Sequence, residues 1–396
     1  MKIVILDGYT TNPGDLSWDF LNEFGTYTVY DRTPKEKIVE RAAGCDIIIT
    51  NKTPIDAETI AALPELKFIT LLSTGFNVVD VDFARERGIP VSNVPCYSTS
   101  AVAQLVFAFI LEHTNRVALH SEAVHAGEWS SCPHFCFWKS PLTELQGKTL
   151  GIIGYGKIGK AAAKIAEAFG MNVLANSRSA KVGDRDGEVR FVETDELLEK
   201  SDFVTLHCPL TPQTTGMVNT QFIEKMKPSA FLINTSRGPV VDEQALAEAL
   251  DDGKIARYVT DFANPASANM KNAIVLPHLG ASTGEAEDNC ALMAANQIRD
   301  YLENGNIVNS VNYGRVDLGP LVSGSRLALF HENVQGVIGQ ISQAIADNSL
   351  NIENMSNVSR GSNAYTLLDV SGEIDKGLRS RLLKIGGVRR VRVIVR

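Results

Sequence analysis

The feature that most constrains this chain is a glycine-rich segment in its middle, with an apolar run before it and a helix-forming run after it. Residues 148–160 read KTLGIIGYGKIGK, and the run AAAKIAEAFG follows. In such a strand–turn–helix context the first glycine permits a tight turn, the second lets backbone amides approach a pyrophosphate, and the third lets the helix pack close to the strand. The helix amino terminus adds positive partial charge. The sequence therefore predicts a dinucleotide-binding turn made of Gly154, Gly156, Lys157, Ile158 and Gly159.

The composition suits two or three domains rather than one. The chain has 396 residues, of which 44% are hydrophobic and 21% are charged, so it can bury substantial cores. A net charge of −8 argues against an electrostatic nucleic-acid binder, because such proteins neutralise phosphates with clustered Lys and Arg. We therefore expect no nucleic-acid partner.

Targeting and membrane segments are not predicted either. The apolar start of the chain is too short for a signal peptide. The longest apolar run, Leu105–Leu111, is far below the length of a membrane span. The six cysteines show no framework spacing, which suits reduced thiols. We therefore expect a cytoplasmic protein without a membrane partner.

A cluster of histidines and cysteines between residues 120 and 136 resembles a metal-binding pattern. Its CPHFC spacing matches no common zinc knuckle, and aromatic residues such as Trp129 and Phe135 are interleaved with it. We prefer to interpret the segment as a loop of packed aromatic residues, so no metal is predicted.

Strand and helix patterns alternate through most of the chain, which predicts an α/β fold with parallel sheets. The last module instead reads strand, helix, strand, strand, helix, strand. The predicted fold is two doubly wound parallel-sheet domains, of Rossmann and flavodoxin-like type, followed by a small ferredoxin-like βαββαβ domain. The predicted boundaries are 1–100 with 285–312 for a discontinuous substrate domain, 101–284 for the nucleotide domain with a linking helix at 101–117, 313–324 for a linker, and 325–396 for the last domain.

Polar side chains follow strands of the central module, at the sheet edge where doubly wound folds bind ligands. Arg237 lies in the segment NTSRG after one strand and can form a bidentate pair with a carboxylate. Asp261 ends another strand, and His278 lies between a strand and a helix start. A lone arginine or histidine is usually structural, but the shared edge and the nucleotide turn favour catalysis by Arg237 and His278.

These segments, in this order, resemble the D-isomer-specific 2-hydroxyacid dehydrogenases over nearly the whole chain. The resemblance implies hydride transfer between the alcohol carbon of a 2-hydroxy acid, or its 2-oxo acid, and NAD or NADP. Arg237 would then hold the substrate carboxylate and polarise the carbonyl, and His278 would exchange the hydroxyl proton. The loop Ser73-Thr74-Gly75 would bind the substrate carboxylate through its backbone amides. The cofactor-lining positions implied by the resemblance are Cys208, Pro209, Thr235, Ser236, Asp261 and Gly280.

The sequence departs from that family at the acid that normally orients the histidine. The family places a glutamate shortly after the aspartate, whereas here Asp261 is followed by FANPAS, without an acid. Loss of an orienting carboxylate lowers activity about 10⁴-fold in a protease triad, which we take as an upper bound. We therefore expect a low-activity enzyme, unless Asn264 or an acid from elsewhere in the chain partly replaces the glutamate.

The ribose-binding position also departs from the common pattern. An acid about 20 residues beyond the glycines would bind a ribose 2′-hydroxyl. Here the strand ends ANSRS, which places Ser177 and Arg178 at that position. Without an anionic group a 2′-phosphate is tolerated rather than repelled, although an Arg178 that points into solvent is the alternative. We expect NADPH at least to compete with NADH.

The last module resembles an ACT domain of the serine-sensing kind that is attached to 3-phosphoglycerate dehydrogenases. The segments FHEN and LNI carry this likeness. By position His331, Asn333 and Asn351 would bind L-serine across a dimer of such domains, although plain capping roles are an alternative. This tail makes 3-phosphoglycerate dehydrogenase of serine biosynthesis the first predicted activity. The apolar helix that leads into the nucleotide module resembles the family's dimer arm, so a homodimer or homotetramer is expected.

The first two-thirds of the chain indicate a different branch of the family. Asn51-Lys52-Thr53 and residues 135–145 look more like glycerate dehydrogenases and hydroxypyruvate reductases, which usually lack an ACT tail. The two likenesses meet near residues 257–261, so a recombined chain would explain the missing glutamate. Lys52 would offer the substrate one positive charge where phosphoglycerate enzymes tend to use arginines. Glycerate or hydroxypyruvate turnover is therefore the alternative activity, and a low-turnover nucleotide sensor is a candidate of another class.

Overall fold

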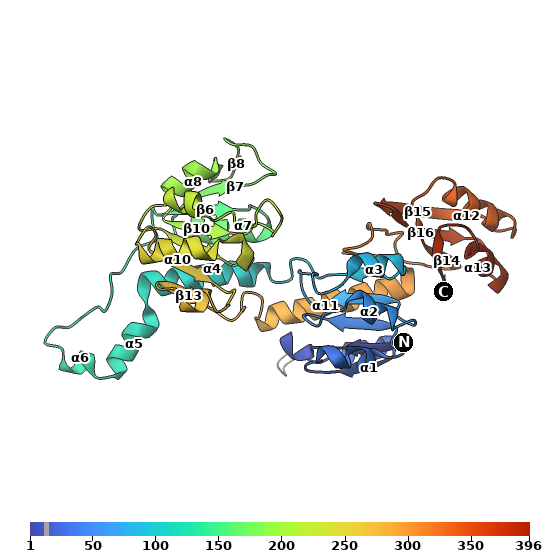
Figure 1. The fold of residues 1–396 in the computed structure, drawn as a ribbon, viewed down its shortest axis with the longest axis horizontal. Helices are drawn as coiled ribbons and strands as arrows, with labels where there is room; N and C mark the ends of the chain where they lie inside the picture. Colours follow the sequence, from blue (N-terminus) through green and yellow to red (C-terminus); the bar gives the residue numbers. More distant parts are fainter. Residues whose placement is uncertain (12–15) are drawn as a thin grey trace. The chain divides into compact units, whose positions relative to one another are not determined.

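The computed structural model describes residues 1–11 and 16–396, and the chain forms two compact units. One unit comprises Met1–Tyr97 and Gly284–Arg396, and the other comprises Ser98–Thr283. Figure 1 shows the elements of both units along the chain. The second unit is therefore an insertion into the first.

The first unit begins with a five-stranded parallel sheet in the order β2-β1-β3-β4-β5. All residues of β3 and β4 are buried, as expected for strands covered on both faces. Asp56 caps α2 by accepting from the backbone N–H of Thr59, and Asp80 caps α3 by accepting from that of Phe83. The elements are β1 (Lys2–Ile5), β2 (Thr26–Val29), α1 (Ile38–Ala42), β3 (Ile47–Thr50), α2 (Ala57–Ala61), β4 (Phe68–Leu71), α3 (Val81–Glu86) and β5 (Val91–Ser92), with short 3₁₀ turns at Gly8–Thr10, Asp19–Phe24 and Lys35–Lys37.

The chain returns to the first unit through the long helix α11 (Gly284–Asn304). Tyr301 of this helix stacks on Phe68 of β4, with ring centroids 4.6 Å apart. The segment expected to be a linker, 313–324, is packed rather than free, because Tyr313 and Leu321 are buried in the same apolar core.

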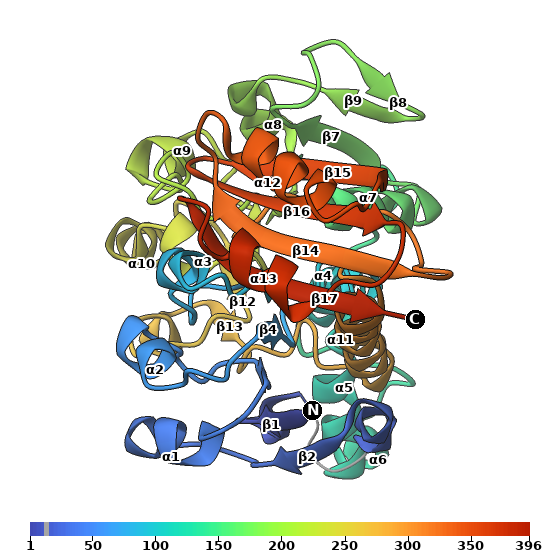
Figure 2. The ribbon, with the colours of Figure 1, turned by 90° about the vertical axis from the view of Figure 1, so that its right-hand side faces the viewer.

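The last module is a four-stranded antiparallel sheet in the order β15-β16-β14-β17, with the predicted βαββαβ succession of elements. Its two helices cover one face of the sheet (Figure 2). The other face contributes Phe330 and Tyr365 to the core that contains Tyr301 of α11. The elements are β14 (Ser325–Glu332), α12 (Val337–Ala346), β15 (Ile352–Arg360), β16 (Asn363–Val370), α13 (Lys376–Leu382) and β17 (Val388–Val395).

The second unit is built on an eight-stranded sheet in the order β13-β12-β11-β10-β6-β7-β9-β8. All its strands are parallel except β8, which pairs antiparallel with β9. The strand order reverses at β6, which precedes the glycine turn, and doubly wound sheets bind ligands at such a point. The predicted parallel α/β sheets are thus confirmed. The elements are β6 (Thr149–Ile153), α7 (Lys157–Ala168), β7 (Asn172–Asn176), β8 (Arg185–Asp186), β9 (Val189–Phe191), α8 (Thr194–Lys200), β10 (Phe203–Leu206), α9 (Thr220–Glu224), β11 (Phe231–Asn234), α10 (Glu243–Asp251), β12 (Arg257–Thr260) and β13 (Ala273–Val275), with 3₁₀ turns at Gly238–Val240 and Ser267–Asn269.

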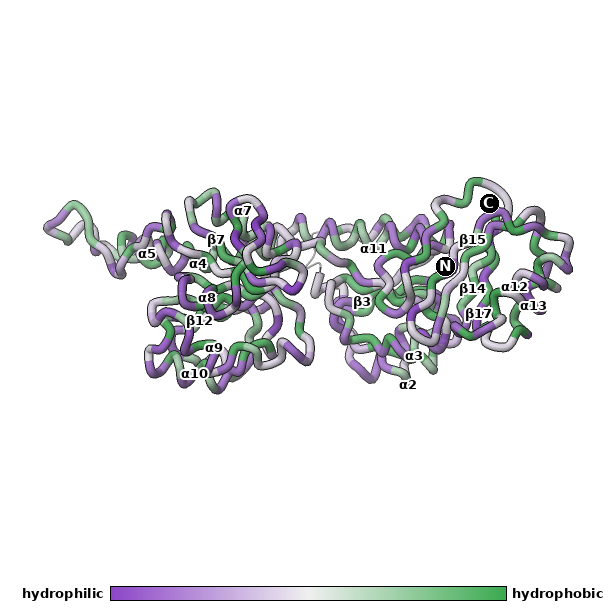
Figure 3. The backbone as a smooth tube through the Cα atoms, turned by 90° about the horizontal axis from the view of Figure 1, so that it is seen from above, coloured by the Kyte–Doolittle hydropathy of each residue, from purple (hydrophilic) through white to green (hydrophobic). Residues whose placement is uncertain are grey.

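An extension of the second unit precedes its glycine turn and reaches away from the sheet (Figures 1 and 3). Helix α4 (Thr99–Asn115) packs along α7 and leads into α5 (Val117–His125) and α6 (Glu128–Ser131). The loop that follows exposes large aromatic side chains, Phe135 and Trp138. Among the residues that the structure describes, none of the helices has the length and apolar character needed to cross a bilayer.

Candidate active site

The glycine turn after β6 has the geometry that its sequence requires. Gly154 has φ 98°, and a Cβ there would lie 2.6 Å from the backbone nitrogen of Cys208. A Cβ on Gly159 would lie 2.5 Å from the carbonyl oxygen of Gly154, so helix α7 packs closely on the turn. A Cβ on Gly156 would meet nothing within 4 Å. The turn therefore leaves open space beside Gly156, at the amino terminus of the helix that starts at Lys157 and Ile158.

The neighbouring strand β7 ends without an acid. Asn176 donates through its amide to the carbonyl oxygen of Val192 at 3.0 Å. Ser177 and the exposed Arg178 follow it. Burial raises the pKa of the Cys208 thiol, and the positive charge of Arg178 opposes that shift, so Arg178 lies within electrostatic range of the loop after β10.

A buried asparagine that the sequence analysis did not single out shapes the turn after β11. The Asn234 amide donates to the carbonyl oxygen of Arg237 at 2.9 Å, and its Oδ1 accepts from the backbone N–H of Ser236 at 3.0 Å. The Ser236 hydroxyl donates to the carbonyl oxygen of Cys208, which joins this turn to the loop after β10. The Oγ1 of Thr235 is buried and has no partner in the described part of the chain. The signal that could have identified Asn234 is a polar residue that ends an otherwise apolar strand.

Asp261 is a buried carboxylate at the end of β12, with 2% of its surface exposed. Its Oδ2 accepts from the backbone N–H of Gly280 at 2.9 Å, and its Oδ1 has no hydrogen-bond partner among the described residues. Burial raises the pKa of Asp261, while the charges of His278 and, after it, Arg237 oppose that shift. Arg237, Asp261 and His278 thus follow three neighbouring parallel strands, β11, β12 and β13, at the carboxyl edge of the sheet.

His278 lies after β13 with a left-handed backbone, φ 61°. Its Nδ1 is 4.0 Å from Oδ2 of Asp261, and its side chain is 50% exposed. The ring lies against Phe262, with ring centroids 4.9 Å apart. His278 and Phe262 line a pocket of about 440 Å³ together with Gly238, Pro239, Ala263 and Asn264. None of these lining residues is an acid.

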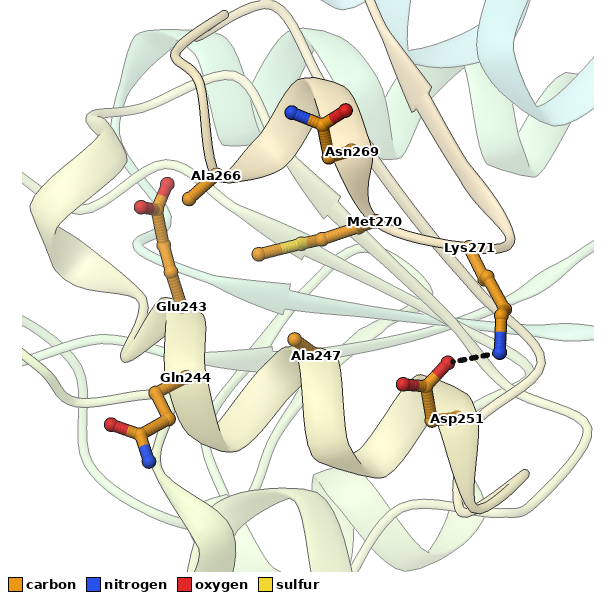
Figure 4. Close-up of a pocket in the computed structure, with 8 residues that line it drawn as sticks. All are labelled: Glu243, Gln244, Ala247, Asp251, Ala266, Asn269, Met270 and Lys271. Carbon is orange, nitrogen blue, oxygen red and sulfur yellow. Dashed lines mark ion pairs between the residues drawn. The ribbon is translucent and has the colours of Figure 1, made fainter.

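Asn264 does not replace the missing glutamate, because its amide is already engaged. Its nitrogen donates to Oε1 of Glu243 at 2.6 Å, and its oxygen accepts from the backbone N–H groups of Ala266 and Ser267, each at 2.9 Å. Glu243 lines a separate pocket that runs along α10 (Figure 4). An ion pair between Lys271 and Asp251, with the nitrogen and oxygen 3.1 Å apart, borders this pocket. Asn264 therefore shapes the loop after β12 rather than orienting the histidine.

The residues expected to bind the substrate lie in the first unit, in loops at the carboxyl ends of β3 and β4. The Ser73 hydroxyl donates to the carbonyl oxygen of Gly75 at 2.8 Å, and that of Thr74 donates to Val94 at 3.1 Å. Lys52 is exposed, and its backbone N–H donates to the buried carboxylate of Asp7 at 2.5 Å. Asp7 is a further residue that the sequence analysis did not identify.

The residues expected to bind serine do not come together within one chain. The buried His331 has both ring nitrogens engaged, with the Glu332 carbonyl at 2.8 Å and the Thr366 hydroxyl at 2.7 Å. Asn333 follows the last residue of β14, whereas Asn351 pairs with Ser371 at the end of the sheet where β14 begins. A site made of these residues would need a second copy of the module.

The histidine–cysteine segment between residues 120 and 136 has other contacts. The ring nitrogens of His120 contact the Arg116 carbonyl at 2.9 Å and the backbone N–H of Lys139 at 3.0 Å. No group of three or more His, Cys, Asp and Glu side chains among the residues that the structure describes is arranged to hold a metal ion. The Trp129 indole donates to the Phe135 carbonyl at 2.9 Å.

Comparison with known proteins identifies the family. Residues 107–280 match the family of the NAD-binding domain of D-isomer specific 2-hydroxyacid dehydrogenases. A hydroxypyruvate reductase of Blautia hydrogenotrophica is 45% identical over 323 residues, which cover 79% of this chain and 100% of that protein. A D-3-phosphoglycerate dehydrogenase of Haemophilus influenzae is 36% identical over 358 residues, which cover 87% of this chain and 85% of that protein.

A solved structure shares the fold as well. An acyclic imino acid reductase in complex with NADPH and D-Arg superposes with a TM-score of 0.68 at 31% identity, and the match covers 78% of this chain and 100% of that one. The predicted family and the predicted NAD or NADP cofactor are confirmed. This chain belongs to the D-isomer-specific 2-hydroxyacid dehydrogenases, NAD(P)-dependent oxidoreductases that act on a CH–OH group.

Proposed function

We propose that this protein reduces hydroxypyruvate to D-glycerate, and catalyses the reverse reaction, with NADH or NADPH. The observation that carries the proposal is the placement of Arg237, the buried Asp261 and His278 after three neighbouring parallel strands, at the carboxyl edge of the nucleotide sheet. Hydroxypyruvate is favoured over phosphohydroxypyruvate because the identity to a hydroxypyruvate reductase, 45%, exceeds that to a phosphoglycerate dehydrogenase, 36%. Hydroxypyruvate reduction, the alternative activity predicted from the sequence, therefore comes before 3-phosphoglycerate dehydrogenation, the activity predicted first.

The residues at the edge of the nucleotide sheet fit a bound nicotinamide nucleotide. The empty space beside Gly156 accepts a pyrophosphate at the amino terminus of α7. The unpaired buried Oδ1 of Asp261 suits the N–H of a carboxamide, and the unpaired Oγ1 of Thr235 offers another polar contact. When bound in its reduced form, the nicotinamide supplies the hydride that reduces the substrate carbonyl carbon.

Arg237 and His278 carry the remaining chemistry. The Arg237 guanidinium pairs with the substrate carboxylate and polarises the neighbouring carbonyl. His278 donates a proton to the carbonyl oxygen as the C–H bond forms, which gives the hydroxyl group, and it takes that proton back in the oxidation direction. Asp261 helps to stabilise the protonated imidazole, although the distance of 4.0 Å makes this a longer contact than a hydrogen bond. We therefore expect turnover below that of family members with an orienting glutamate.

The residues at the end of β7 also support the use of NADPH. No acid stands among residues 175–180, and Arg178 is exposed, which favours a 2′-phosphate at this strand end. Arg178→Asp is expected to weaken NADPH binding at least tenfold, roughly one charge-assisted contact. NADH binding should be kept or strengthened, because an acid there can bind the ribose 2′-hydroxyl. Fluorescence titration of both nucleotides checks this, and a wild-type protein with a strong preference for NADH would contradict it.

The C-terminal module supports 3-phosphoglycerate dehydrogenase as a second candidate activity. We propose that the βαββαβ module is an ACT domain and that L-serine binds between two copies of it through His331, Asn333 and Asn351. The βαββαβ order of elements supports this assignment. Because Asn333 and Asn351 lie at opposite ends of the sheet, the proposed site would be shared by two copies.

We also propose a homodimer or homotetramer and a cytosolic location. The exposed aromatic loop after α6 and the apolar groove between α4 and α7 support self-association, since both are on the same unit and each leaves apolar surface uncovered. Three lysines, Lys157, Lys160 and Lys164, line that groove, and the extension carries the acids Glu112, Glu122, Glu128 and Glu144. All six cysteines are free thiols, which supports a reducing compartment.

One experiment separates the candidate functions. NADH and NADPH are titrated by fluorescence, and hydroxypyruvate and phosphohydroxypyruvate are then assayed with and without L-serine. We expect turnover of hydroxypyruvate. Faster turnover of phosphohydroxypyruvate with inhibition by serine would select the second candidate, and nucleotide binding without turnover of either substrate would select a nucleotide sensor.

A further inference from the structure

The loop after β12 contacts both the backbone before His278 and the ring of His278. Phe262 forms an isolated antiparallel bridge with Pro277, the residue directly before His278. The Phe262 ring also lies against the imidazole, with ring centroids 4.9 Å apart. The position of this loop and the position of His278 are therefore linked, through the backbone and through a side chain.

Asn264 holds this loop in shape from within. Its Oδ1 accepts from the backbone N–H groups of Ala266 and Ser267, each at 2.9 Å. The Ser267 hydroxyl accepts from the N–H of Asn264 at 3.0 Å and lies 3.3 Å from the carbonyl oxygen of Phe262. Because only the oxygen of the Asn264 side chain can accept from two amides, its nitrogen must point the other way. There it donates to Oε1 of Glu243 at 2.6 Å.

Glu243 belongs to a helix rather than to a loop. It is the first residue of α10 and directly follows Asp242, which caps the helix by accepting from the backbone N–H of Ala245 at 3.2 Å. Leu246 and Leu250 of the same helix are buried in an apolar core of this unit. The carboxylate is thus carried by a packed element, and a negative charge in the first turn suits the helix dipole.

The part of the loop around Asn264 has little apolar support. A pocket of about 390 Å³ lies between α10 and residues 266–271 (Figure 4). Asn264 contacts Glu243 at the start of α10, and Lys271 pairs with Asp251 at the end of this helix. The residues on either side of Asn264 are exposed, namely Ala263, Pro265 and Ala266. The hydrogen bond to Glu243 therefore matters more for this part of the loop than burial does.

We propose that Glu243 is a positioning residue for His278 and that it acts through Asn264 and the loop that carries Phe262. This inference rests on the proposed proton transfer by His278. The carboxylate fixes the Asn264 side chain, that side chain fixes the loop, and the loop keeps the Phe262 ring against the imidazole. The family's glutamate, which this sequence lacks, would contact the histidine directly. Glu243 instead restrains it indirectly, from a neighbouring helix.

The test is Glu243→Ala, which removes the acceptor of the Asn264 amide. We expect kcat for hydroxypyruvate to fall about tenfold and KM to change less than about twofold, because His278 loses orientation while Arg237 still binds the substrate carboxylate. Glu243→Gln keeps an oxygen for Asn264 and should restore most of kcat. The matched control is Asp251→Ala, which removes the exposed ion pair at the other end of α10 and should leave kcat unchanged.

An NMR measurement decides the same question without turnover. The chain has seven histidines, so the imidazole Hε1 signal of His278 can be assigned by its absence in His278→Gln. Because the ring current of Phe262 shifts nearby protons, this signal should move in Glu243→Ala and stay in place in Glu243→Gln and Asp251→Ala. Glu243→Met, which keeps the length of the side chain without its acceptor, serves the same purpose if the alanine variant does not fold.

The role of Glu243 would be overturned by an unchanged kcat or an unmoved His278 signal in Glu243→Ala. An equal loss of kcat in Glu243→Gln or in Asp251→Ala would overturn it as well, since neither should free the Asn264 amide. Absence of hydroxypyruvate turnover in the wild-type protein would instead contradict the proposed function. The NMR signal would then still decide whether Glu243 positions His278.

Discussion

The sequence near His278 lacks the glutamate with which the family orients this histidine. The His278 ring lies against Phe262, at 4.9 Å between ring centroids, and its Nδ1 is 4.0 Å from Oδ2 of Asp261. Asn264, the polar side chain that lines the same pocket, is occupied by Glu243 and by its own loop. Since an orienting carboxylate keeps a base in the reactive geometry, the missing glutamate is expected to lower kcat more than it raises KM.

The glycine turn provides a matched pair of substitutions. Gly154→Ala places a Cβ 2.6 Å from the Cys208 nitrogen at φ 98°, so it should destabilise the fold as well as nucleotide binding. Gly156→Ala meets nothing within 4 Å, so it should keep the wild-type Tm and yet weaken NADH binding by occupying the space for the pyrophosphate. Thermal melts and NADH titrations check both. A Gly156→Ala protein that binds NADH normally would contradict the assignment of this turn.

A histidine outside the site predicts how stability depends on pH. Burial, followed by the charges of Arg257 and Arg116, lowers the pKa of His113 to about 4, and its Nδ1 has no partner among the described residues. Because the unfolded chain takes up this proton first, the contribution of His113 to stability is complete above about pH 6.5 and is lost as the pH falls toward 4. His113→Gln should therefore flatten the decline of Tm between pH 7 and pH 4.5, roughly the interval in which the two states differ in protonation. An unchanged decline would refute this role.

The strands show why much of the site could be predicted from the sequence. Arg237, Asp261 and His278 each follow a short apolar run, and parallel strands bring their carboxyl ends to one edge. The spacing of the glycines likewise reflects local geometry, since the backbone of Gly154 and the helix contact at Gly159 are set within a few residues. Features of this kind are visible along the chain without knowledge of the fold.

Other features depend on contacts between distant segments and could not be predicted in this way. The edge strand β2 has an alternating, partly exposed pattern without an apolar run. Asp7 accepts from the backbone N–H of Asn51 only because β1 and β3 are neighbours in the sheet. A buried arginine, Arg326, looked like any other charge in the sequence, yet it is 1% exposed.

Arg326 ties the last module to the end of helix α11. Its guanidinium pairs with Asp369 at 2.5 and 3.0 Å and donates to the carbonyl oxygens of Asn304 and Gly319, each at 2.8 Å. Arg326→Met leaves a carboxylate without its partner and the helix end uncapped, and should lower the free energy of unfolding by about 3–5 kcal/mol. Chemical denaturation measures this loss. The double variant Arg326→Met with Asp369→Leu should recover part of it, and no recovery would mean that the backbone contacts dominate.

For the molecule as a whole, the C-terminal module is part of a core rather than a detachable addition. Phe330 and Tyr365 share a cluster with Tyr301 of α11, and the Tyr365 hydroxyl donates to the carbonyl of Gly305 at 2.6 Å. Truncation after Gly324 should therefore expose this cluster, lower Tm and cause aggregation. A truncated chain with the full Tm and activity would show that the module is independent.

The reaction itself is tested most directly by steady-state oxidation of NADH and NADPH with hydroxypyruvate, in the wild-type protein and in Arg237→Met and His278→Gln. We expect slow but measurable turnover in the wild type, a loss of about 10²–10⁴-fold in kcat for His278→Gln, and a large rise in KM for Arg237→Met. Nucleotide affinity should stay unchanged in both variants. Two results would contradict the assignment of Arg237 and His278 as the groups that bind the substrate and move its proton. One is turnover at the wild-type rate in both variants, and the other is a wild-type protein that binds the nucleotide without any turnover.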